Sequence, residues 1–169
     1  DTLSQKMDAF LNGLVQNNHF SGSVLVMKDG EEILKKGYGL ADRENKIPYT
    51  PETISTVGSV TKQFTGTAIL KLEMMGKLTV QDELEKYFPG APADKKKITL
   101  HQLLTHTAGL KPAIGDDYEP LTRDAFMERA MATPLNTAPG EQYDYSNVGY
   151  SILAAIVELT GGMGYEQFL

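Results

Sequence analysis

The sequence predicts an α+β fold in which a helical region accompanies part of an antiparallel sheet. Two strand-like runs, residues 23–28 and 31–38, flank Asp29-Gly30, a strong tight-turn signal, and together predict a hairpin. Apolar residues recur at helical spacing over residues 3–17 and in several later stretches. A chain of 169 residues is long enough for one domain with a real core.

The later helices are predicted from start and stop signals. Thr99 with Gln102 forms a capping-box pattern, and Gly76 and Gly161-Gly162 are typical helix stops. We expect helices over residues 59–75, 79–87, 99–109, 122–131 and 146–160, with another beginning at Tyr165. The first of these carries an apolar stripe that is expected in the core: Phe64, Ala68, Leu72 and Met75.

Composition excludes several functional classes. The net charge of −6 argues against a nucleic-acid surface, and the one basic run, residues 95–97, is interpreted as solvated. The sequence has no cysteine, so it has no disulfide or thiolate chemistry. No apolar run reaches the roughly 18 residues of a membrane span. No His-Glu-x-x-His motif occurs, and we expect neither a metal nor a cofactor.

Ser59 and Lys62 lie three residues apart at an expected helix start, which places a hydroxyl and an amine on one face. A serine alcohol is a poor nucleophile unless a neighbour accepts its proton, and a partly desolvated lysine amine can do so. Unpaired N–H groups at the helix start can face a developing oxyanion. Alone, the pair is more typical of a helix cap beside a solvated lysine.

Tyr145 and Asn147 stand at the start of the last long predicted helix, on a loop that could face Ser59. A phenol near an amine or a helix start can have a lowered pKa and transfer protons. An asparagine amide can donate to and accept from a substrate amide. Taken singly, Tyr145 fits a buried aromatic residue and Asn147 a helix cap.

Together these motifs resemble the penicillin-recognising serine hydrolases. The resemblance consists of Gly58-Ser59-x-x-Lys62-Gln-Phe, then Leu-Leu-Thr-His-Thr-Ala-Gly-Leu at 103–110, then Tyr145-Ser-Asn147 after Pro139-Gly140. Ser-x-x-Lys is a signature of β-lactamases and penicillin-binding proteins. The second motif is Tyr-x-Asn rather than Ser-Asp-Asn, so the resemblance points to class C β-lactamases, related esterases and D-stereospecific peptidases. It covers nearly the whole chain.

The resemblance implies an acyl-enzyme mechanism on an ester, amide or β-lactam. Ser59 would be the nucleophile, Tyr145 the general base and Asn147 a substrate-binding residue. Lys62 would accept the first proton or supply the charge that keeps Tyr145 reactive, and the sequence leaves both open. The backbone N–H of Ser59 would form one arm of an oxyanion hole.

The resemblance also implies a β-lactamase/transpeptidase-like fold of which this chain holds the N-terminal portion. Residues 1–38 would supply a helix and hairpin, and residues 55–169 the helical region with both motifs. The family's third motif, Lys-Thr-Gly or His-x-Gly on a C-terminal strand, does not follow Asn147, and the sheet is incomplete. We therefore expect a further segment or a second chain to complete the sheet, and poor activity or folding without it.

Location and partners are expected from the same resemblance. The chain has no signal peptide and starts at Asp1, which fits a processed N-terminus. Such proteins mostly work in the periplasm, at the cell envelope or outside the cell. The expected partner is a small-molecule or peptide substrate, with no nucleic acid and no membrane span.

Two alternatives remain open. One is a non-catalytic binding module that keeps the fold, and the other is an inactive fragment that lacks the third motif. His106 invites a Ser-His-Asp triad, but Ser59 is not in a Gly-x-Ser-x-Gly elbow. We therefore expect His106 to be a buried hydrogen-bonding residue.

Overall fold

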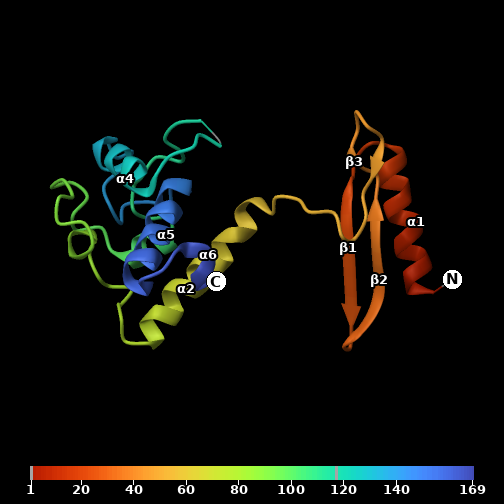
Figure 1. Ribbon diagram of the computed structural model, residues 1–169, viewed down its shortest axis with the longest axis horizontal. Coiled ribbons are helices and arrows are strands. Elements are labelled where there is room, and N and C mark those ends of the chain that lie inside the picture. The colour runs from red at the N-terminus through yellow and green to blue at the C-terminus, as the bar shows by residue number, and fades with distance from the viewer. Residues whose placement is uncertain (1, 117) are drawn as a thin grey trace. The chain divides into compact units, whose positions relative to one another are not determined.

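A computed structural model describes residues 2–116 and 118–169. They fall into two units, one ending at Thr56 and the other running from Val57 to Leu169. The first unit contains α1 and the strands β1 to β4, and the second contains α2 to α6 with two 3-10 turns (Figure 1).

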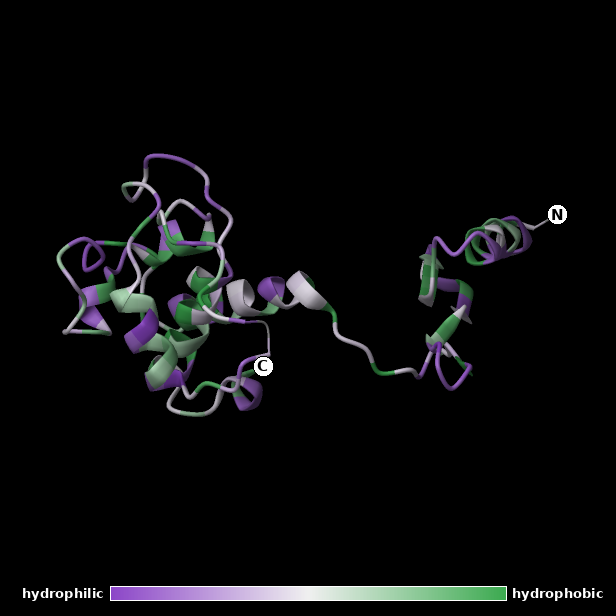
Figure 2. Ribbon diagram, turned by 90° about the horizontal axis from the view of Figure 1, so that it is seen from above, coloured by the Kyte–Doolittle hydropathy of each residue, from purple (hydrophilic) through white to green (hydrophobic). Residues whose placement is uncertain are grey.

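The first unit begins with α1 (Leu3–Gln16), which is capped as its sequence suggests. The Thr2 hydroxyl accepts from the Gln5 backbone N–H, and the Gln5 side chain accepts from the Thr2 N–H, which completes a capping box. The helix beside the N label in Figure 2 carries both green and purple residues, as an amphipathic helix should.

The predicted hairpin is confirmed. β1 (Gly22–Lys28) pairs antiparallel with β2 (Glu31–Tyr38), with a register irregularity between Val26 and Met27. Asp29 and Gly30 have φ angles of 53° and 84°, the left-handed pair that a tight hairpin turn of this kind requires. Two short strands follow, β3 (Leu40–Asp42) and β4 (Ile47–Pro48), which pair with each other.

Helix α1 packs against β2. The Asp8 carboxylate accepts hydrogen bonds from Lys36 Nζ and Tyr38 Oη, both at 2.7 Å. These contacts lower the pKa of Asp8, because both donors stabilise its charged form. Burial and Asp8 raise the pKa of Tyr38 to about 12. The contact therefore ties α1 to the hairpin by charge as well as by packing.

The second unit is built around α5, which packs against α2, α3 and α4. Figure 1 shows α2 in yellow-green beside α5 in blue. The elements of this unit are η1 (Gly58–Val60), α2 (Thr61–Met74), η2 (Leu84–Lys86), α3 (Leu100–Leu104), α4 (Arg123–Ala132), α5 (Asn147–Gly161) and α6 (Tyr165–Phe168).

Local end signals place most of these helices. Thr99, Thr122 and Ser146 accept from the backbone N–H three residues on, so each is an N-cap. Gly162 closes α5 in the left-handed conformation, with φ of 74°. The interior residues of α5 meet α2 and α3 in a core whose fully buried large side chains are Ile69, Leu72, Leu84, Ile98, Leu100, Leu103, Ile152, Leu153, Ile156 and Val157.

The expected helix from Thr79 to Tyr87 is wrong. Only the single 3-10 turn η2 forms there. The backbone N–H groups of Leu84 and Glu85 donate to carbonyl oxygens of residues 98 and 96 instead of to their own turn. At the start of this segment, the Asp82 carboxylate accepts a hydrogen bond from the Thr79 N–H at 2.9 Å. Pairing with a distant segment therefore replaces the helix.

Two burial expectations also need correction. In the apolar stripe of α2, Ala68 and Leu72 are buried, but Phe64 and Met75 are 54% and 49% exposed. Of the basic run, Lys95 is buried and pairs with Asp94 Oδ2 at 2.8 Å, so the run is not uniformly solvated. Sequence spacing assigns a face to a helix, but the packing of other elements decides how far that face is covered.

Candidate active site

The 3-10 turn η1 and the first turn of α2 bring Ser59 and Lys62 together. Ser59 lies in η1, immediately before α2, and Lys62 lies in the first turn of the helix. Lys62 Nζ donates to Ser59 Oγ at 3.2 Å. Gly58, with φ of 52°, begins this turn in the left-handed region, which glycine adopts without strain.

Tyr145 reaches the same point from the segment directly before α5, whose N-cap is Ser146. Its Oη and Ser59 Oγ share a hydrogen bond of 2.6 Å. The neighbouring residue Ser146 is buried and fixes the local backbone: its Oγ donates to the Lys111 carbonyl at 2.7 Å and accepts from the Gly149 N–H at 3.1 Å. Tyr145 is therefore held directly before a well-anchored helix start.

Asn147 completes the group. It is the first residue of α5, and its Oδ1 accepts from Lys62 Nζ at 2.7 Å. The Asn147 backbone N–H donates to the Pro112 carbonyl at 2.9 Å. The structure thus brings together all four residues that the sequence singled out, with Lys62 between the serine and the asparagine.

Charge shapes the chemistry of this group. The Lys62 ammonium and the Ser59 hydroxyl lower the pKa of Tyr145, and the lysine contributes most. Lys62 Nζ also lies 4.9 Å from the centroid of the Tyr145 ring. The phenolate form of Tyr145 is therefore easier to reach than that of an ordinary tyrosine, which has a pKa of about 10.

His106 lies behind Tyr145 rather than beside Ser59. Its Nδ1 accepts a hydrogen bond from the Ser146 backbone N–H at 3.1 Å, and the centroid of its ring lies 4.4 Å from that of Tyr145. Burial and the charge of Lys62 lower the pKa of His106. The expected hydrogen-bonding role is confirmed, although the residue is only partly buried.

Ser59, Lys62 and Asn147 line a cleft of about 350 Å³, which is also lined by residues that the sequence analysis did not single out. Tyr150 is one turn beyond Asn147 on α5, and its Oη donates to the Leu104 carbonyl at 2.9 Å. Tyr165 of α6 shares a hydrogen bond of 2.6 Å with Thr65 Oγ1. The spacing of Asn147 and Tyr150 could have revealed the first, since residues three apart share a helix face.

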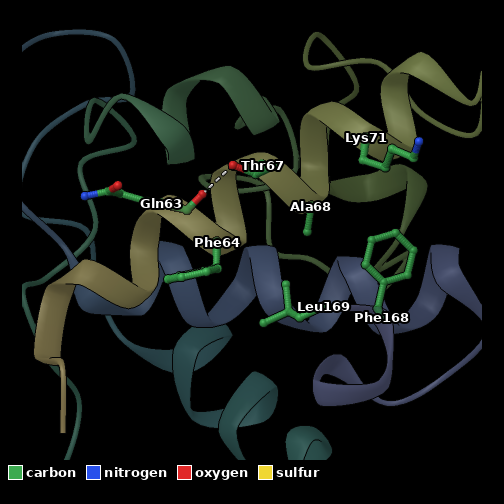
Figure 3. A pocket seen from close by; sticks show the side chains of 7 residues that line it. All are labelled: Gln63, Phe64, Thr67, Ala68, Lys71, Phe168 and Leu169. Carbon is green, nitrogen blue, oxygen red and sulfur yellow. Dashed lines mark hydrogen bonds between the residues drawn. The ribbon is translucent and has the colours of Figure 1, made fainter. Parts of the chain in front are cut away.

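A larger hollow of about 510 Å³ lies on another side of α2 (Figure 3). Phe64, Ala68, Phe168 and Leu169 give it largely apolar walls. Its one hydroxyl, that of Thr67, donates to the Gln63 carbonyl at 2.8 Å (dashed in Figure 3). This hollow is larger than the cleft at Ser59, but Ser59, Lys62 and Asn147 lie in that smaller cleft.

Two kinds of feature are not found in the described parts of the chain. Residues 2–116 and 118–169 contain no group of three or more His, Cys, Asp or Glu side chains arranged to hold a metal ion. Over the same residues, no helix combines the length and the apolar character needed to cross a membrane.

Comparison with known proteins identifies the family. A family model described as Beta-lactamase matches residues 3–169. The chain belongs to the β-lactamase family. The resemblance read from the Ser59, 103–110 and Tyr145 motifs is thereby confirmed.

Relatives within the β-lactamase family include penicillin-binding and hydrolytic members. Protein Flp of Staphylococcus aureus (strain MW2) is 33% identical over 174 residues, covering 98% of this chain and 35% of Flp. The octameric penicillin-binding protein homologue from Pyrococcus abyssi superposes with a TM-score of 0.82 at 32% identity, over 99% of this chain and 41% of its own. A class C β-lactamase superposes with a TM-score of 0.81 at 27% identity, over 99% and 48%.

These superpositions confirm the predicted fold class, α+β of the β-lactamase and transpeptidase type. They also show how much of each relative's length this chain spans. The chain spans 35% of Flp and 41% of the Pyrococcus protein, so it corresponds to well under half of either.

Proposed function

We propose that the protein is a serine hydrolase that forms an acyl-enzyme on Ser59 with an ester, an amide or a β-lactam. The observation that carries this proposal is the position of Ser59 Oγ, 2.6 Å from Tyr145 Oη and 3.2 Å from Lys62 Nζ. A hydroxyl between a phenol of lowered pKa and an ammonium group is arranged for activation as a nucleophile.

In the proposed acylation, the phenolate of Tyr145 accepts the Ser59 proton while Ser59 Oγ bonds to the substrate carbonyl carbon. Tyr145 then gives that proton to the leaving group as the scissile bond breaks. Lys62 stays an ammonium, which fits its donation to Ser59 Oγ and to Asn147 Oδ1. Of the two proton acceptors left open by the sequence, the shorter contact favours Tyr145.

Deacylation reverses these roles. Tyr145 removes a proton from water, the hydroxide attacks the ester carbonyl, and Ser59 leaves with the proton returned by Tyr145. Asn147 is proposed to bind the amide side chain of the substrate through its carboxamide. The backbone N–H of Ser59 is proposed as one arm of the oxyanion hole, whose donors typically contribute 10² to 10³ in rate each.

The substrate range is proposed from the relatives. Penicillin-binding protein homologues and a class C β-lactamase support a β-lactam or a peptide related to it, and a simple ester is the least demanding acyl donor. We further propose action at the cell envelope, in the periplasm or outside the cell. A segment beyond the domain portion described here, or a second chain, is proposed to complete the sheet.

The alternative is a non-catalytic binding module or an inactive fragment, which keeps the fold without turnover. Hydrolysis of a chromogenic ester and of a chromogenic cephalosporin by the full-length protein separates the two. A hydrolase loses turnover in Ser59→Ala and keeps it in Ser55→Ala, an exposed serine outside the cleft. A binding module shows no turnover in either, and its Ser59→Ala variant keeps its affinity for the unreacted compound.

A further inference from the structure

His106 holds both neighbours of Tyr145 in the chain. Its backbone carbonyl accepts from the Asp144 N–H at 2.7 Å. Its side-chain Nδ1 accepts from the Ser146 N–H at 3.1 Å. The backbone N–H groups of both neighbours of Tyr145 are therefore anchored to one residue, which lies 40 positions earlier than Ser146 in the chain.

The imidazole ring also contacts aromatic side chains around the site. Its centroid lies 4.4 Å from the Tyr145 ring, with the planes tilted by 31°, and 5.1 Å from the Tyr150 ring. The Tyr143 ring meets it edge-on at 5.7 Å. The ring thus packs against Tyr145 together with Tyr150 and Tyr143.

The backbone of His106 is set by the end of α3. The Thr107 N–H donates to the Gln102 carbonyl at 2.9 Å and the His106 N–H to the Leu103 carbonyl at 3.3 Å, which is the Schellman pattern. His106 occupies the left-handed position of that pattern, with φ of 59°. Glycine or asparagine is usual there, so a histidine is retained at a conformational cost.

The hydrogen bond to Ser146 requires a neutral imidazole. A nitrogen that accepts a hydrogen bond carries no proton, whereas both ring nitrogens are donors in the charged form. The groups that face the ring are the Lys62 ammonium and the phenols of Tyr143, Tyr145 and Tyr150. The Asp144 carboxylate instead accepts from the side chains of Thr137 and Gln142.

Resting on the proposed acyl-enzyme chemistry, we propose that neutral His106 is the positioning residue that holds the Tyr145 phenol against Ser59. Protonation of His106 removes the acceptor for the Ser146 N–H and adds a positive charge near Lys62. Tyr145 then loses one of its two backbone anchors. Ser59 acylation therefore needs the deprotonated forms of both Tyr145 and His106.

Two substitutions separate the effect of the His106 side chain from the effect of its left-handed backbone conformation. Asparagine and glycine both accept the left-handed conformation, so His106→Asn and His106→Gly keep the end of α3. His106→Asn also presents Oδ1 near the place of Nδ1, and His106→Gly presents no acceptor. His101→Asn is the matched control, because His101 is exposed on the same helix.

The test measures how fast a fluorophosphonate labels Ser59 in the full-length protein between pH 4.5 and 9, a range on the order of four to five units that brackets the ordinary histidine pKa of about 6.5. His106→Gly is expected to label about 10²-fold more slowly, as a misplaced catalytic group does. His106→Asn should regain most of that loss. As the pH decreases, the labelling rate of His106→Asn should decrease with the uptake of one proton. The wild-type labelling rate should instead decrease with the uptake of two protons at pH values below the ordinary histidine pKa.

A wild-type rate in His106→Gly overturns the proposal, and so does an equal loss in both variants with the wild-type pH profile kept. Nitrogen-15 NMR of the His106 ring gives a readout free of catalysis. An unprotonated Nδ1 at neutral pH is expected, and a protonated Nδ1 also overturns the proposal. If the wild-type protein is not labelled at all, the acyl-enzyme chemistry fails, while the ring nitrogens still report on His106.

Discussion

Ser59 Oγ and Tyr145 Oη share a hydrogen bond of 2.6 Å although the residues lie 86 positions apart in the chain. The contact exists because α2 packs on α5, which brings η1 before α2 and the residue before the N-cap of α5 together. Lys62 links the two starts by donating to Ser59 Oγ and to Asn147 Oδ1. The group of Ser59, Lys62, Tyr145 and Asn147 therefore forms where the N-termini of the two helices meet.

Replacing Tyr145 by phenylalanine should slow the acylation of Ser59 by about 10² to 10⁴, because the proposed general base is lost while the ring remains. The second-order rate of fluorophosphonate labelling measures this. Tyr118→Phe, at a residue that is 91% exposed, is the control and should label at the wild-type rate. A wild-type rate in Tyr145→Phe would assign the proton to Lys62 instead.

The pH dependence should follow Tyr145. Its pKa is lowered, so the phenolate forms at lower pH than in an ordinary tyrosine, and acylation should rise with pH and level off below about 10. Lys62→Gln removes the main cause of the lowering, so the pKa of Tyr145 should rise toward its ordinary value and the rate profile should move to higher pH. Carbon-13 NMR of the tyrosine Cζ atoms measures this pKa directly. An unchanged Tyr145 pKa in Lys62→Gln contradicts the assignment.

Gly109→Ala should destabilise the second unit more than Gly76→Ala does. Both glycines are left-handed, with φ of 70° and 68°. A Cβ at Gly109 would lie 2.2 Å from the Thr137 carbonyl oxygen, whereas a Cβ at Gly76 meets nothing within 4 Å.

Gly76→Ala therefore reports the backbone cost alone, about 1 to 2 kcal/mol, and Gly109→Ala adds the clash. Urea unfolding of both variants gives the difference in free energy of unfolding. Equal losses would mean that the segment at Thr137 moves aside freely.

Features governed by local backbone chemistry were predictable from the sequence. The turn at Asp29-Gly30, the caps at Thr99 and Ser146 and the stop at Gly162 each depend on a few neighbouring residues, and the structure has all of them. The four residues that the structure brings together stand in recognisable motifs at or just before helix starts, which is why the sequence singled them out.

Features governed by distant contacts were not predictable. Residues 79–87 were expected to be helical, but two of their N–H groups pair with residues 96 and 98. Lys95 is buried despite its basic neighbours, and α3 ends at Leu104 instead of near Gly109 because His106 turns left-handed. The contact of His106 with Tyr145 depends on that turn, which sequence spacing does not encode.

The most direct test is intact-mass spectrometry of the full-length protein after incubation with a labelled penicillin and, separately, a fluorophosphonate. A single covalent adduct is expected that maps to Ser59, is absent from Ser59→Ala and persists in Ser55→Ala. An unmodified protein in a demonstrably folded sample, or an adduct that survives in Ser59→Ala, contradicts the claim that Ser59 is the acyl-accepting nucleophile.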